Sequence, residues 1–205
     1  VDGQADYRTT ATATATTTIC VDGQNPNTPT GLASSTHTAN VWSSVNNITF
    51  NWTPGADVGC SGLASQQYGL GNSTCPTPGT TTGAATNTRT ETALGSVTSG
   101  NGYYFAVRGV DNCGNTGASG CIGPFLIDTV LPTLASVSIN SGAATTTSLN
   151  VTVASSTSDA HSGVIEMRFS SNNSTWSAWQ PYVASSAYDL SSNGGNTNEG
   201  TKTVW

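Results

Sequence analysis

The sequence predicts an all-β protein made of two tandem β-sandwiches, on the grounds of composition, an internal repeat and strand-like alternation. Almost three in ten of the 205 residues are Thr or Ser, 23 are Gly, and 8% are charged. An ordinary globular protein has about 25% charged residues. Thr favours strands, and Gly, Asn and Ser favour turns, so this composition predicts short strands joined by turns. Since no stretch shows sustained 3.6-residue periodicity, we expect essentially no helix.

The chain repeats itself at an offset of 101 residues. The matched pairs are 48–52 with 149–153, 61–63 with 162–164, Tyr68 with Phe169, and 72–74 with 173–175. Several matches that keep one offset through a loop and two strands are hard to obtain by chance. A period of about 100 residues is typical of an immunoglobulin-type β-sandwich.

Apolar residues alternate with polar ones within the individual strands. Segments 48–52 and 102–108 both show this pattern, which is expected of half-buried strands. Segment 125–127 is expected to close the first sandwich, and 128–132 to link it to the second.

Segments 61–63, 103–115 and 123–128 resemble the tandem immunoglobulin-like and fibronectin type III-like repeats of bacterial cell-surface proteins. In the second half, 162–170 and 176–182 resemble the same group. The resemblance covers most of the chain. It implies sandwiches of this type and an extracellular, tandemly repeated context, and it implies no catalytic residues.

The two sandwiches are expected to differ in completeness. Residues 23–132 are predicted to form a complete first domain, whereas 133–205 form an incomplete second domain. The second stops within the strand that corresponds to 103–107 of the first, so its last strands must come from elsewhere.

Residues 1–22 have the features of the strands that the second domain lacks. Residues 1–6 resemble 107–111, and 9–22 alternate between β-branched polar and apolar positions, as a terminal strand does. The apolar positions of this predicted inter-unit strand are Ala11, Ala13, Ala15, Ile19 and Val21.

The linker repeats as well, because Asp22 precedes Pro26 by four residues just as Asp128 precedes Pro132. Segment 23–30 is too short to return residues 1–22 to their own second domain, so an identical neighbouring unit is expected to supply them. The unit is either one period of a longer polypeptide or a separate subunit that exchanges strands. Covalent continuity is favoured, because charged termini inside a core-facing strand are costly. Both versions give a linear head-to-tail polymer.

Five cysteines in a chain with a single lysine indicate an oxidising, extracellular or cell-surface setting. Disulfides are favoured over zinc, because the sequence has no C-x-x-C motif and no pair of histidines. Cys60 with Cys113 would join two loops at one end of the first domain, and Cys113 with Cys121 is the alternative. Cys20 and Cys75 have no assignable partner and are candidates for cross-links between units. The odd number leaves one thiol free or bonded to another chain.

Four acidic residues are candidates for a Ca²⁺ site. Asp57 and Asp159 precede the matched Ser-Gly loops, Asp111 follows the strand at 103–107, and Asp128 opens the linker. Carboxylate oxygens suit Ca²⁺, and sandwich geometry brings such loops to one end. Turn capping by these side chains is the favoured alternative, because the dense acidic pattern of strong calcium loops is absent. No other cofactor is expected.

Trp176, Trp179 and Tyr182 are spaced like a platform on which a sugar ring could stack. Packing against the sheet is the favoured alternative, because buried aromatic residues dominate the cores of sandwiches.

The number and placement of charged, apolar and histidine residues exclude several function classes. Five scattered cations cannot build a basic patch, so no nucleic acid partner is expected. No apolar run approaches the roughly 20 residues that span a bilayer, so no membrane insertion is expected. His37 and His161 lie outside any recognisable nucleophile motif, and the glutamates are scattered, so no enzyme is expected.

The sequence therefore predicts a structural repeat unit of an extracellular filament, sheath or surface stalk, with identical units as its partners. The alternative is an adhesin or carbohydrate-binding module with surface glycans as ligands.

Overall fold

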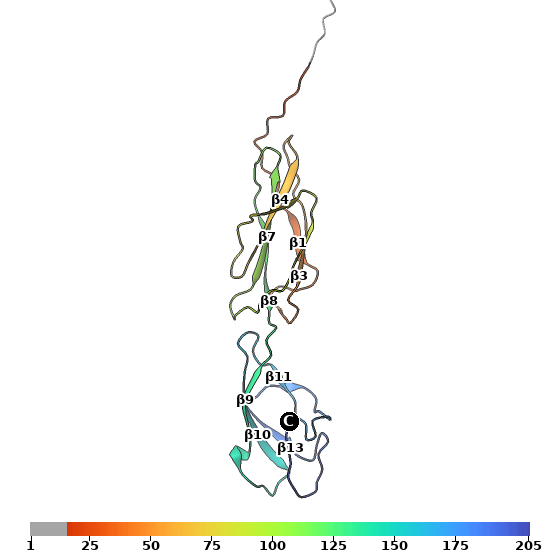
Figure 1. The fold of residues 1–205 in the computed structure, drawn as a ribbon, viewed down its shortest axis with the longest axis vertical. Helices are drawn as coiled ribbons and strands as arrows, with labels where there is room; N and C mark the ends of the chain where they lie inside the picture. The colour runs from red at the N-terminus through yellow and green to blue at the C-terminus, as the bar shows by residue number, and fades with distance from the viewer. Residues whose placement is uncertain (1–15) are drawn as a thin grey trace, which may run out of the picture.

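The computed structural model describes residues 16–205 and shows two β units that follow each other along the long axis of the molecule (Figure 1). The described part of the chain is almost entirely strand and loop, and its one helical segment is the 3-10 turn Asn140–Gly142. None of its helices could span a membrane. The prediction of an all-β sandwich protein is confirmed.

The first unit contains two facing sheets. The three-stranded sheet has the order β1 (Thr30–Ser34), β3 (Ile48–Thr53), β6 (Thr88–Glu91). The five-stranded sheet has the order β2 (Trp42–Ser43), β8 (Gly120–Ile127), β7 (Tyr103–Asp111), β4 (Leu63–Gly71), β5 (Thr80–Gly83). All pairs are antiparallel except β2 with β8. Two such sheets around one apolar core make a sandwich of the immunoglobulin or fibronectin III type.

The core of the first unit is formed by alternate residues of its central strands, as the sequence pattern predicts. Phe50 stacks on Phe105, with ring centroids 4.3 Å apart, and meets Phe125 edge-on at 5.5 Å. The buried cluster consists of Ile48, Phe50, Trp52, Phe105, Val107, Phe125 and Ile127. The last four of these seven residues belong to β7 and β8, so these two strands supply more than half of the buried apolar side chains.

A buried glutamine ties the two sheets of the first unit together. The Trp52 indole N–H on β3 donates to Gln66 Oε1 on β4 at 2.7 Å. The Gln66 amide nitrogen donates to the carbonyl oxygens of Ala84 at 2.9 Å and Thr86 at 2.6 Å. Gln66 is completely buried, and these bonds satisfy both ends of its amide.

The second unit repeats only part of this plan. One sheet has the order β13 (Ser185–Asp189), β10 (Asn150–Ser158), β9 (Thr133–Ile139), and a two-stranded ladder joins β11 (Glu166–Met167) to β12 (Gln180–Pro181). Its buried apolar residues are Val151, Val153, Phe169, Tyr188 and Leu190. Strand β10 corresponds to β3 at the repeat offset, and it buries Val151 and Val153 as β3 buries Phe50 and Trp52.

Trp205 begins a further pairing in the second unit. Its backbone N–H donates to the Ser170 carbonyl oxygen at 2.8 Å, and its own carbonyl oxygen accepts from the Ser170 N–H at 3.1 Å. Ser170 corresponds to Gly69 of β4, which pairs with Ala106 of β7. Trp205 therefore lies where a strand equivalent to β7 would run.

The two units meet at the linker after β8. Asp128 accepts hydrogen bonds from the backbone N–H groups of Val130 at 2.9 Å and Ser162 at 3.0 Å. His161 Nδ1 lies 2.9 Å from the carbonyl oxygen of Val97, and this hydrogen bond also crosses the junction. The linker is therefore hydrogen-bonded to the second unit.

Residues 16–21, at the start of the described chain, are exposed, whereas Pro26 and Pro29 closer to the first unit are buried. Residues 16–29 belong to no strand, and Ile19 and Val21 are 89% and 87% exposed. The predicted strand positions Ala11, Ala13 and Ala15 lie outside the described residues. Their contact with a neighbouring unit stays a prediction.

Candidate functional site

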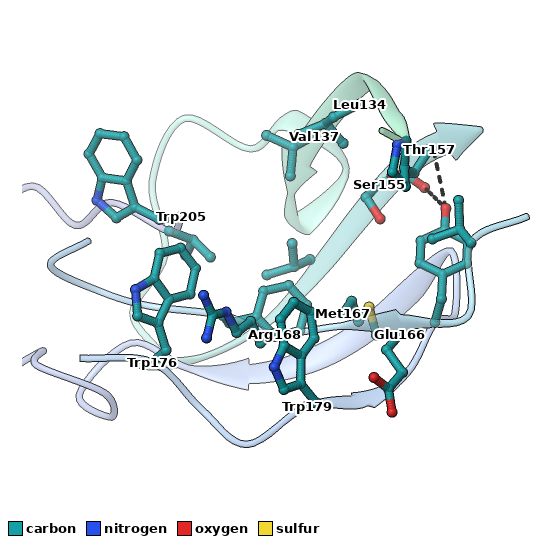
Figure 2. A pocket seen from close by; sticks show the side chains of 16 residues that line it. Leu134, Val137, Ser155, Thr157, Glu166, Met167, Arg168, Trp176, Trp179 and Trp205 are labelled. Carbon is teal, nitrogen blue, oxygen red and sulfur yellow. Dashed lines mark hydrogen bonds between the residues drawn. The ribbon is translucent and has the colours of Figure 1, made fainter. Parts of the chain in front are cut away.

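The second unit carries an open groove of about 690 Å³ along its core. Strands β9 and β10 form one wall, and the segment from Val164 to Phe169 with the side chains of Trp176 and Trp179 forms the other (Figure 2). Val204 and Trp205 also line it. The lining is mainly apolar, so the groove exposes apolar surface to water.

The groove is open because nothing in the described chain covers β9 and its neighbours. Leu134 and Val137 of β9 are 59% and 54% exposed. Leu32, on the corresponding strand β1 of the first unit, packs against the core there. In the first unit, β7 and β8 fill the equivalent space with the aromatic and aliphatic side chains named above.

The aromatic residues singled out from the sequence all line this groove. The Arg168 guanidinium lies 4.6 Å from the Trp176 ring centroid and 4.5 Å from that of Trp179, so both rings make cation–π contacts with it (Figure 2). The Tyr182 hydroxyl donates to the carbonyl oxygen of Ser155 and accepts from the Thr157 N–H, both at 3.2 Å. Arg168 thus occupies a ring face of each tryptophan, and the pair is not a bare flat platform. Trp179 is nevertheless 57% exposed.

The disulfides differ from the pairings considered from the sequence. Cys20 pairs with Cys60, and Cys75 pairs with Cys121, with Cα–Cα distances of 6.0 and 6.1 Å. Cys113 is free and exposed. The Cys60–Cys113 and Cys113–Cys121 pairings are therefore wrong, and Cys20 and Cys75 bond within the chain and not to neighbouring units.

Two chain paths explain these pairings. The segment before the first unit lies against the loop after β3, where Asp22 accepts from the Ser61 N–H at 2.8 Å, and this contact brings Cys20 to Cys60. The loop after β4 folds back along that strand. A Cβ on Gly71 would come within 2.7 Å of the Thr74 carbonyl oxygen, so only glycine leaves room for the loop. Cys75 thereby reaches Cys121 on β8 across β7.

The acidic candidates fall at the two ends of the first unit. At the upper end of the first unit, carboxylate oxygens of Asp57 and Asp111 lie within 4.8 Å of each other and of Asp22. The sequence analysis missed Asp22 as a candidate, although its spacing to Pro26 repeats that of Asp128 to Pro132. That repeat was the signal that could have found it.

Hydrogen bonds keep two of these carboxyl groups ionised. Backbone hydrogen bonds from Gln24 and Ser61 lower the pKa of Asp22. Burial alone would raise the pKa of Asp111, but hydrogen bonds from Asn115 and Cys113 outweigh it and lower the pKa.

At the junction between the units, Asp128 and Asp159 hold the loop at 161–163. Asp159 Oδ1 accepts from the backbone N–H groups of His161 at 2.9 Å and Gly163 at 3.0 Å. Burial opposes a low pKa for Asp128, but its hydrogen bonds from Ser162 and Val130 prevail and lower the pKa.

The sheet order gives the chain a tandem β-sandwich architecture of the immunoglobulin or fibronectin III type. No protein-family model matches the chain, and no curated protein matches it. Solved structures that match include the central fibronectin III array of a RIM-binding protein, at 16% identity, and the FN1–FN3 domains of chicken CNTN1, at 11%. Both matches have a TM-score of 0.33 and cover 83% of this chain. The chain spans 59% of the length of each of these structures.

Proposed function

We propose that the chain is a structural repeat unit of an extracellular homopolymeric filament, sheath or surface stalk. In this proposal, residues 1–22 of one unit complete the second sandwich of the preceding unit, and the open groove is the place where they bind. The observation that carries the proposal is the equivalence between the segment before Asp22 and strand β8, which ends before Asp128.

Asp22 and Asp128 make the same contacts in their two units. Each accepts a hydrogen bond at 2.9 Å from the backbone N–H two residues later in the chain. Each also accepts from the N–H of a serine, Ser61 for Asp22 and Ser162 for Asp128, and these serines are 101 residues apart. The chain therefore enters both units in the same way.

Aligning Asp22 with Asp128 pairs the residues that precede them in the sequence. Ile19 corresponds to Phe125, and Val21 corresponds to Ile127. Phe125 and Ile127 are 1% and 0% exposed in the core of the first unit, whereas Ile19 and Val21 are 89% and 87% exposed. Two apolar side chains at core positions of a closing strand are thus left in solvent when the chain is alone.

The groove offers the surface that such a strand needs. Antiparallel addition beside a strand that continues from Trp205 would cover Leu134 and Val137, as β7 and β8 cover the first unit. The second unit, which carries the groove, and the segment that enters the first unit lie at opposite ends of the molecule (Figure 1). Repeated addition therefore builds a linear polymer. Both versions of the linkage, a longer covalent repeat chain and exchange between separate subunits, use this same contact.

The chemical character of the chain supports an extracellular location. Two disulfides are typical of proteins in oxidising compartments. Low charge and abundant Thr and Ser suit a fibre that gains its stability from buried sheet. The resemblance to bacterial cell-surface repeats agrees with a role at the cell surface.

A polypeptide of two identical copies in tandem tests the proposal. Hydrogen–deuterium exchange measured by mass spectrometry should show two equal populations for the peptide that covers residues 16–22. The copy at the internal junction is protected in a ladder, and the leading copy exchanges fast. A single fast-exchanging population would contradict strand completion. Electron microscopy of the native polymer should show an axial repeat of roughly 70–80 Å, about two extended sandwich lengths.

A further inference from the structure

Three carboxylates converge at the upper end of the first unit, where the chain enters it. Asp22 comes from the entering segment, Asp57 from the loop after β3, and Asp111 from the end of β7. One oxygen of each lies within 4.8 Å of the others. Among the described residues, the one salt bridge is between Arg89 and Glu91, so no described side-chain cation is paired with these acids.

One carboxylate oxygen of Asp57 has no hydrogen-bond partner. Asp57 Oδ2 accepts from the Gly62 N–H at 2.8 Å, but Oδ1 exposes less than 1 Å² and has no hydrogen-bond partner. A buried carboxylate oxygen without a partner is costly. Asp159, the matching residue of the second unit, also has one buried oxygen without a partner. The same unsatisfied group therefore recurs at the same place in both repeats.

The other two carboxylates are held in position by backbone groups. Asp22 Oδ1 accepts from the Gln24 N–H at 2.9 Å and Oδ2 from the Ser61 N–H at 2.8 Å. Asp111, which is 2% exposed, accepts from backbone N–H groups of the turn that follows it. Each carboxylate oxygen has about two lone-pair sites. Asp111 Oδ1 uses both, but Asp111 Oδ2 and the two oxygens of Asp22 each accept a single hydrogen bond and can bind a cation as well.

The backbone leaves space for the Asp22 carboxylate. A Cβ added to Gly59 would overlap both carboxylate oxygens of Asp22. A glycine at this position is therefore required for the entering segment to place its acid beside Asp57 and Asp111. The space beside Gly59 is therefore filled by the Asp22 carboxylate and not by an apolar side chain.

We propose that Asp22, Asp57 and Asp111 bind Ca²⁺, with Asp57 Oδ1 as a direct ligand. Oxygen donors favour hard cations, and Ca²⁺ tolerates the irregular geometry of ligands from three separate segments better than Mg²⁺ does. The nearby sulfur atoms of Cys20 and Cys60 are joined in a disulfide, so they cannot act as thiolate ligands. All three acids belong to one chain, so the site does not depend on strand completion.

The bound ion would fasten the entering segment to the first sandwich. Asp22 lies two residues after Cys20, so the ion and the disulfide would hold the same stretch of chain. If that stretch continues into the sandwich of a preceding unit, the ion stiffens the joint between units. Calcium would then control the rigidity of the polymer without taking part in strand addition.

Calorimetric titration of the full chain with CaCl₂ tests the proposal. We expect one ion per chain, with a Kd of about 0.1–1 mM as in other extracellular modules, and a rise in the melting temperature of the first unit. Asp57→Asn should weaken binding at least about tenfold. It should not lower the melting temperature in EDTA, because it removes a buried charge. Glu199→Gln removes the same charge from an exposed loop and should leave binding unchanged.

Asp22→Asn serves as the second variant if Asp57→Asn fails to fold, and it should also abolish the calcium-dependent rise in melting temperature. Absence of both heat and thermal shift with wild-type protein at 10 mM CaCl₂, about ten times the weakest Kd expected, would overturn the proposal. Unchanged affinity in the aspartate variants would overturn it equally.

Discussion

Replacing Ile19 and Val21 together by serine should prevent assembly while leaving the isolated chain intact. Both side chains are almost fully exposed in the single chain, at 89% and 87%. Surface substitutions of this kind usually change the free energy of unfolding by less than about 0.5 kcal/mol. The same substitutions remove the two side chains that correspond to the buried Phe125 and Ile127 of β8.

The expected loss follows from the change in exposure. If strand addition takes these positions to the 1% and 0% exposure of Phe125 and Ile127, nearly all of each side chain leaves water. Full burial of such a side chain contributes about 1.5–3 kcal/mol. The double variant therefore loses about 3–6 kcal/mol of association free energy. This corresponds to an association constant lower by a factor of about 10² to 10⁴.

Sedimentation velocity over a range of concentrations measures this change directly. Val45→Ser is the matched control, because Val45 is an exposed β-branched residue, 55% accessible, that lies outside the entering segment. It should assemble like the wild type. Urea unfolding of the dilute chain should give the same midpoint for all three proteins.

Two results would refute the reasoning. Equal association constants for the double variant and the wild type would show that these side chains do not enter a neighbour's core. A clear fall in the unfolding midpoint of the dilute variant would show that they already support their own chain.

Four further outcomes are expected. Gln66→Leu should lower the free energy of unfolding by about 2–4 kcal/mol in urea titrations, because it leaves the buried Trp52 N–H and two carbonyl groups unpaired. Iodoacetamide should label Cys113 alone under native non-reducing conditions, and labelling of a second cysteine would contradict this bonding pattern. Cys75→Ala should lower the free energy of unfolding by about 2–4 kcal/mol, because it removes the disulfide with Cys121. The pKa of Asp128 is lowered in the folded chain, so its stabilising effect is complete above about pH 4 and is lost as the pH falls through the folded pKa. Asp128→Asn should therefore flatten the acid limb of a plot of urea midpoint against pH.

Much of the fold could be predicted from the sequence, because strand alternation and repetition are local properties. The alternation at 48–52 and 102–108 reappears as β3 and β7, with the predicted faces buried. The offset of 101 residues reappears as the equivalence of β3 and β10. A period of two residues determines which face of a strand is apolar, and no tertiary contact is needed to read it.

Contacts between distant loops could not be predicted in the same way. Cys75 reaches Cys121 because a loop folds back over glycine positions, and Cys20 reaches Cys60 because Asp22 is bound by the Ser61 N–H. Five cysteines permit many pairings, and spacing alone does not select among them.

The repeat, the apolar faces of the central strands and the alternating segment before the first sandwich are visible in the sequence. The disulfide pairs, the groove along the second sandwich, the contact of Arg168 with two tryptophans and the meeting of three aspartates appear once the chain is folded. The first set depends on neighbours along the chain, whereas the second depends on where loops far apart in sequence come together in space.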